Sequence, residues 1–152
     1  MLWFVIGFFC LAIDRLSKIY IANNFVTMKS IPLINNVFHI TYHLNDGAAF
    51  SILGGKTTFL IIASAVIMVG LLCYMIAARP ENNLLMLSLT FILAGAAGNL
   101  YDRIFNNGEV VDFLDFRLIN FPVFNFADCF VTIGAVLLFV YILKFSDKVK
   151  TD

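Results

Sequence analysis

The sequence has 152 residues, of which 61% are hydrophobic and 13% are charged, and its formal net charge at pH 7 is zero. A soluble domain is about 45–50% apolar and about 25% charged, so this composition excludes an ordinary water-soluble protein. It predicts one all-α membrane domain over residues 1–152, and the absence of net positive charge argues against a nucleic-acid partner.

Neither the cysteines nor the histidines have the spacing of metal ligands. Cys10, Cys73 and Cys129 lie in separate apolar stretches, where cysteine usually serves as a small hydrophobic side chain. His39 and His43 have no cysteine or HExxH pattern near them. We therefore expect no metal and no cofactor.

Residues 2–22 form the first predicted transmembrane helix. The stretch lacks the basic start of a cleaved signal peptide, and charged residues occupy the place of a cleavage site. Asp14 and Lys18 are four residues apart toward the end of this helix, so they share a face and can pair. The pair either pins the helix or supports a site behind it, and both roles stay open.

A polar segment at residues 23–56 follows, and we expect it outside the membrane. Residues 37–44 alternate between apolar and polar side chains, which predicts a half-buried strand. Asn45, Asp46 and Gly47 then form a turn signal before the AAFSIL stretch at residues 48–53. We expect a small sheet that rests on the membrane surface.

Two further transmembrane helices are predicted at residues 57–78 and 84–103. The first carries almost no polar group, and we expect it only to fill the helix bundle. The second ends with small residues that allow close helix approach and then a polar face formed by Asn99, Asp102 and Arg103. We expect Asp102 to have a structural role, holding Arg103 in place.

Residues 104–123 form a second surface segment, a loop or short helix, and residues 124–145 form the fourth transmembrane helix. The polar helix ends and both surface segments fall at the same membrane face, which predicts a site there. Because Lys and Arg flank the helices on both sides, the positive-inside rule leaves the orientation undecided.

Three aspartates at this face suggest the chemistry. Asp112 and Asp115 lie in the surface segment, and Asp128 follows at the start of the last helix. Two neighbouring carboxylates cannot both ionise comfortably, so one keeps a proton while the other acts as a base that activates water. The residues alone do not choose between Asp112 and Asp115, or decide which carboxylate is the base. We expect a mobile partner from the loop and a rigid one, Asp128, from the helix.

Five motifs along the chain resemble, in order, those of the lipoprotein signal peptidases, the signal peptidase II family. They are DRLSK at 14–18, NDGAAF at 45–50, GNLYDR at 98–103, VVDF at 110–113 and FNFAD at 124–128. The resemblance implies an aspartyl endopeptidase of the bacterial inner membrane with both termini in the cytoplasm and its site near the outer face. It implies removal of the signal peptide from diacylglyceryl-modified prolipoproteins, just before the lipidated cysteine.

The same resemblance implies roles for individual residues. It assigns catalysis to Asp112 and Asp128, substrate binding to Asn45, Gly47, Asn99, Arg103 and Asn125, and structural support to Asp14, Lys18 and Asp102. The expected partners are lipidated prolipoproteins and membrane lipids, and we expect a monomer. Residues 47–50 could pair with an extended peptide by strand addition.

Two other classes of function remain as alternatives. A small transporter or channel subunit would also carry charges in its membrane helices. Against it, the polar groups gather at one face, and residues 57–78 offer no polar stripe across the membrane. A non-catalytic membrane scaffold, in which the carboxylates only pin loops, is the third possibility.

Overall fold

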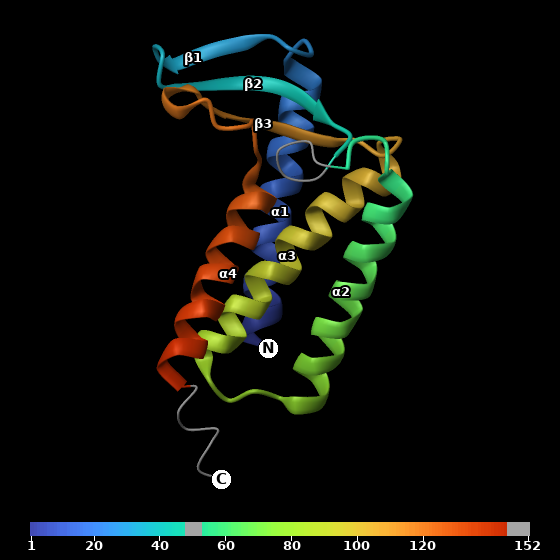
Figure 1. Cartoon of the computed structure of the whole chain (residues 1–152), viewed down its shortest axis with the longest axis vertical. Coiled ribbons are helices and arrows are strands. Elements are labelled where there is room, and N and C mark those ends of the chain that lie inside the picture. Colours follow the sequence, from blue (N-terminus) through green and yellow to red (C-terminus); the bar gives the residue numbers. More distant parts are fainter. Residues whose placement is uncertain (48–52, 146–152) are drawn as a thin grey trace.

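The computed structural model describes residues 1–47 and 53–145, and four long helices stand beneath a small sheet (Figure 1). The helices are α1 (Leu2–Asn24), α2 (Thr57–Ala78), α3 (Asn83–Phe105) and α4 (Phe126–Phe145). The strands are β1 (Ser30–Ile34), β2 (Phe38–Asn45) and β3 (Val110–Phe116), and a short 3-10 helix, η2 (Arg117–Ile119), follows β3. The sheet lies at one end of the bundle, while α1 begins and α4 ends at the other (Figure 1).

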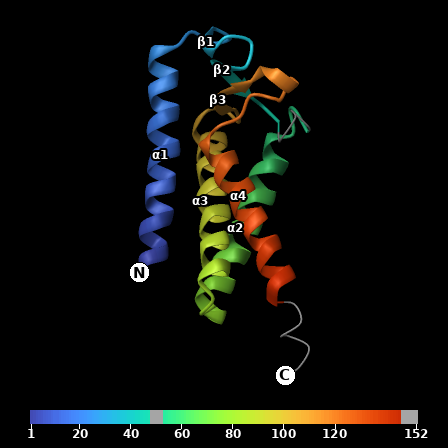
Figure 2. The ribbon, with the colours of Figure 1, turned by 90° about the vertical axis from the view of Figure 1, so that its left-hand side faces the viewer.

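Helix α3 is the centre of the bundle and contacts each of the other three helices (Figures 1 and 2). Small residues permit these contacts, as the sequence predicted. A Cβ atom on Gly95 would meet the backbone oxygen of Ala127 in α4, and one on Gly98 would meet the carboxylate of Asp14 in α1. Helix α2 packs mainly on α3, so α2 and α4 line two different sides of it.

Gly98→Ala should destabilise the protein by about 1–3 kcal/mol, the usual effect of overpacking a tight contact. The added methyl group would push Asp14 away from α3 and from the start of α4. The matched control is Gly70→Ala, because a Cβ on Gly70 meets no atom within 4 Å. Thermal unfolding in detergent measures both variants. Equal unfolding temperatures for the two would contradict the proposed close contact.

Three helices of the described chain, α2, α3 and α4, are long and apolar enough to cross a membrane. Helix α1 is not among them, because it contains Asp14, Arg15 and Lys18. The helix continues to Asn24, two residues beyond the predicted end, so Asp14 and Lys18 lie slightly further from its end than expected. Many large apolar side chains of α1 are nevertheless exposed, among them Phe4, Phe8, Leu16 and Tyr20.

The sheet is antiparallel with the order β1-β2-β3. The predicted strand at 37–44 is confirmed as β2, shifted by one residue, and its partners are β1 and β3. Residues 48–52 of the AAFSIL stretch lie outside the described part of the chain. Ile40, Tyr42 and Leu44 of β2 pack against a core cluster at the top of α1 and β3, so the sheet is fastened to the bundle.

Strand β3 corrects one expectation. Residues 104–123 were predicted as a loop or short helix, yet VVDFLDF at 110–116 is a strand, and beyond the end of α3 at Phe105 only η2 is helical. Valine and phenylalanine favour the extended chain, and β3 pairs with β2 on both sides of one register shift. Asp112 therefore comes from a paired strand and not from a loop.

Candidate active site

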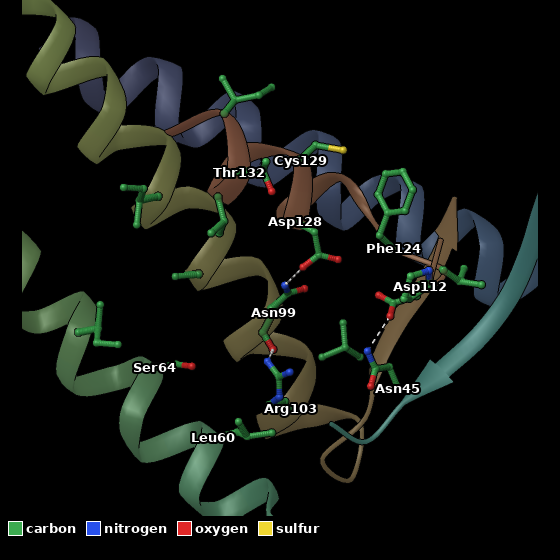
Figure 3. Close-up of a pocket in the computed structure, with 18 of the residues that line it drawn as sticks. Asn45, Leu60, Ser64, Asn99, Arg103, Asp112, Phe124, Asp128, Cys129 and Thr132 are labelled. Atoms are coloured by element: carbon green, nitrogen blue, oxygen red, sulfur yellow. Dashed lines mark hydrogen bonds between the residues drawn. The ribbon is translucent and has the colours of Figure 1, made fainter. Parts of the chain in front are cut away.

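A cavity of about 800 Å³ lies between α2 and α4, and α3 contributes to its wall (Figure 3). Asp112 and Asp128 both line it, from β3 and from the first turn of α4. Three of the predicted substrate-binding residues line the same cavity: Asn45, Asn99 and Arg103. The remaining wall is mostly apolar and includes Leu60, Ile67, Ile92, Ala96, Phe124 and Val131.

Asn125 joins the two carboxylates. Its side-chain Nδ2 donates to Oδ1 of Asp112 at 2.6 Å, and its backbone N–H donates to Oδ2 of Asp128 at 3.1 Å. The backbone N–H of Asp128 donates back to Oδ1 of Asn125 at 3.0 Å. This reciprocal pair is a capping box at the start of α4, and it fixes both side chains relative to the helix.

The capping box also explains why α4 begins at Phe126 and not at the expected Phe124. Phe124 instead pairs with Leu114 of β3 through backbone hydrogen bonds of 2.8 and 3.0 Å. The chain is thus still extended at Phe124 and turns into the helix at Asn125. This turn brings the last helix directly under β3.

Asn99 of α3 donates to the second carboxylate oxygen of Asp128 (Figure 3). Its Nδ2 donates to Oδ1 of Asp128 at 2.8 Å, and its Oδ1 accepts from Nζ of Lys18 at 2.9 Å and from Nδ2 of Asn125 at 3.1 Å. An ammonium group can only donate hydrogen bonds. Lys18 therefore fixes which end of the Asn99 amide faces Asp128.

Asp112 is buried in β3, where it lies opposite His43 of β2. Its Oδ2 accepts a hydrogen bond of 2.9 Å from Nδ2 of Asn45 (Figure 3). Burial, together with the negative charge of Asp128, raises the pKa of Asp112 to about 7, although the hydrogen bonds from Asn45 and Asn125 oppose the shift. Asp112 is thus suited to hold a proton near neutral pH.

Arg103 lines the same cavity from the last turn of α3. One guanidinium nitrogen donates to the backbone oxygen of Gly47 at 2.6 Å, and the backbone N–H of Gly47 donates to Oδ1 of Asn45 at 2.9 Å. Arg103 and Asn45 thus hold the chain where residues 48–50 begin. The predicted strand addition at 47–50 falls largely on residues outside the described part.

An ion cluster formed by Asp14, Arg15, Lys18 and Asp102 lies next to Asn99 and contacts it through Lys18. The predicted pair of Asp14 and Lys18 is confirmed at 2.9 Å, and Lys18 also contacts Asp102 at 3.0 Å. Asp102 does not hold Arg103, contrary to expectation. It pairs instead with Arg15 at 2.8 Å and accepts from the backbone N–H of Val111 at 3.2 Å, and sequence reasoning gave Arg15 no role.

Asp115 lies apart from this network. Its Oδ2 accepts hydrogen bonds from Thr41 at 2.6 Å and from Arg117 at 2.8 Å, within the sheet. It does not line the cavity, whereas Asp112 does. The geometry therefore favours Asp112 over Asp115 as the partner of Asp128, a choice that spacing alone left open.

The wall formed by α2 was missed by the sequence analysis. Leu60, Ser64 and Ile67 line the cavity, although this helix was expected only to fill the bundle. Its composition is so uniformly apolar that no pattern marks the face turned to the cavity. Thr132 of α4 was likewise overlooked, because one hydroxyl in an apolar helix carries little signal on its own.

Comparisons with known proteins agree with one another. The sequence matches the family model described as signal peptidase (SPase) II over residues 6–144. A lipoprotein signal peptidase of Clostridioides difficile is 44% identical over 149 residues, which cover 97% of this chain and 99% of that protein. One from Brevibacillus brevis is 43% identical, covering 91% of this chain and 92% of that protein.

Two solved structures of bacterial membrane enzymes are similar to this chain over nearly its whole length. A bacterial membrane enzyme determined at 2.3 Å resolution has a TM-score of 0.90 and 35% sequence identity, with 99% of this chain and 92% of that chain covered. A second bacterial membrane enzyme, at 1.9 Å resolution, has a TM-score of 0.84 and 36% identity, covering 93% of this chain and 92% of that chain.

Proposed function

Because this chain belongs to the signal peptidase II family, we propose that it is an aspartyl endopeptidase that cleaves diacylglyceryl-modified prolipoproteins. The cut falls just before the lipidated cysteine and releases the signal peptide. The observation that carries the proposal is the pair of carboxylates, Asp112 and Asp128, which line one cavity and are joined by Asn125.

In the mechanism that we infer, Asp128 is the base. It lies in the first turn of α4, where the helix dipole favours a negative charge, and it accepts hydrogen bonds from Asn99 and Asn125. Asp128 takes a proton from a water molecule, whose oxygen attacks the scissile carbonyl. Asp112, protonated because of its raised pKa, donates to the carbonyl oxygen, and a proton then passes to the leaving amine.

The shape of the cavity suits a substrate that arrives through the lipid. Its walls are mostly apolar and come from helices α2, α3 and α4, while the carboxylates and most other polar groups gather at the end near the sheet. The apolar part would take the signal peptide and acyl chains. Arg103 and Asn45 would hold the main chain near the scissile bond.

We infer that α1 also crosses the membrane, giving four transmembrane helices with both termini in the cytoplasm. Its apolar side chains are exposed, while Asp14 and Lys18 are buried against α3. The sheet and the carboxylates then lie at the outer face of the bacterial inner membrane. We expect the enzyme to act as a monomer.

Activity should fall as pH rises through about 7, because the mechanism needs protonated Asp112 and its pKa is raised to about 7. The hydrogen bond from Asn45 stabilises the ionised form of Asp112 and so lowers its pKa. Asn45→Ala should therefore move the alkaline limb of the kcat/KM profile to higher pH, besides lowering the rate. A limb that stays in place or moves to lower pH would contradict this assignment.

The direct test of the function is cleavage of a prolipoprotein by the purified chain in detergent. The substrate is supplied with and without the diacylglyceryl group. We expect a cut before the lipidated cysteine in the lipidated form only. If neither form is cut, the proposed function is wrong.

A further inference from the structure

Two hydroxyl groups that line the cavity lack the backbone partner that three other helical hydroxyls have. Ser17, Ser88 and Thr90 each donate to a backbone oxygen of their own helix, at 2.7–2.8 Å. Among the described residues, Ser64 of α2 and Thr132 of α4 have no hydrogen-bond partner, and both line the cavity. Figure 3 shows them on its two opposite walls.

This difference matters because little water is available inside a membrane. A hydroxyl in a membrane helix usually donates to the carbonyl oxygen one turn earlier, which satisfies it within the helix. A hydroxyl that is left open in a mostly apolar cavity favours an occupant that carries a hydrogen-bond acceptor. Thr132 follows Asp128 by four residues, about one helical turn and about 6 Å along α4, and so lies near the site of chemistry.

We propose that Ser64 and Thr132 donate hydrogen bonds to carbonyl oxygens of the lipidated substrate and thereby select it. This inference rests on the proposed function. The carbonyl groups can come from the two fatty-acid esters of the diacylglyceryl group or from the main chain of the signal peptide. A helical signal peptide uses its carbonyl groups for its own hydrogen bonds, so the esters are the acceptors we expect.

The test compares Ser64→Ala, Thr132→Val and the double variant on two lipidated substrates. One substrate carries the natural ester-linked diacylglyceryl group, and the other carries a dialkylglyceryl group whose ether links lack carbonyl oxygens. Each single variant should lower kcat/KM for the ester substrate by roughly 3- to 10-fold, mainly through a higher apparent KM, as expected for a lost hydrogen bond. Neither should change the result with the ether substrate.

Thr90→Val is the matched control. It removes a hydroxyl of the same kind from a membrane helix, but that hydroxyl bonds to the backbone of Met86 and does not line the cavity. Its kinetics should equal those of the wild type. Unfolding temperatures of all variants should stay close to that of the wild type, which separates a binding role from a structural one.

The outcomes distinguish ester from peptide carbonyl groups as the acceptors of the Ser64 and Thr132 hydroxyl groups. A loss with the ester substrate alone supports contact with the lipid, and an equal loss with both substrates supports contact with the peptide. Wild-type kinetics in both cavity variants would overturn the inference while leaving the proposed function intact. If the wild type cleaves neither substrate, the proposed function fails and this inference fails with it.

Discussion

Asp112→Asn and Asp128→Asn should each lower kcat for cleavage of a lipidated prolipoprotein by at least about 10³-fold. Asparagine keeps the size of each side chain, but it can neither accept a proton from water nor give one to the leaving group. The two carboxylates act as one unit, so the double variant should be little worse than either single variant. Single-turnover cleavage in detergent measures the loss, and unfolding temperature checks the fold.

Asp115→Asn is the control for this pair. Asp115 bonds to Thr41 and Arg117 within the sheet and not to the cavity network, so the variant should keep cleaving. Near-normal activity in Asp112→Asn, together with loss in Asp115→Asn, would reverse the assignment. A scaffold would lose its fold in the Asp112 and Asp128 variants, and a transporter would lose flux with no cleavage to measure.

Lys18→Met should lower the free energy of unfolding by about 3–5 kcal/mol, the usual effect of removing one partner from a buried ion pair. Lys18 is buried and contacts Asp14, Asp102 and Asn99 at 2.9–3.0 Å. Without its charge, the carboxylates of Asp14 and Asp102 lose a shared counterion. Asn99 also loses the contact that fixes its amide, so cleavage should fall along with stability.

A double variant separates these two effects. Lys18→Met leaves Asp14 without a counterion, whereas Asp102 keeps Arg15. Adding Asp14→Asn removes the unpaired carboxylate, so the double variant should recover part of the stability but little of the activity. Lys144→Met is the matched control, because Lys144 is exposed near the end of α4. If Lys18→Met unfolds at the same temperature as this control, the ion cluster does not support the fold.

Much of the site could be predicted from the sequence because its residues are polar in an apolar chain. The spacing of Asp14 and Lys18 predicted their ion pair, and glycine at position 98 predicted the close approach of helices. The partners of Asp102 could not be predicted in this way. Arg103, the next residue in the chain, donates to Gly47 instead. Arg15, which does pair with Asp102, is 87 residues away in the sequence.

Strand β3 and the choice between Asp112 and Asp115 could not be predicted from the sequence, for reasons that the sheet makes clear. Strand β2 alternates clearly, but β3 is buried on both sides at its start, so Val110 and Val111 give no alternation to read. The choice between Asp112 and Asp115 depends on which face of β3 each side chain occupies, and this depends on the register with β2. Register depends on how two strands pair, so the sequence of one strand does not determine it.

The ion cluster of α1 and α3 has a consequence for how the protein is made. Helix α1 is synthesised first, and Asp14 and Lys18 can pair within it. If α1 crosses the membrane, as we propose, Arg15 is costly in the lipid interior until Asp102 arrives, 87 residues later. The helix that leaves the ribosome first can therefore take its final place only after α3 has been inserted. Stable insertion of the first helix then depends on the third, and a nascent chain that stops before α3 would leave Arg15 without its counterion.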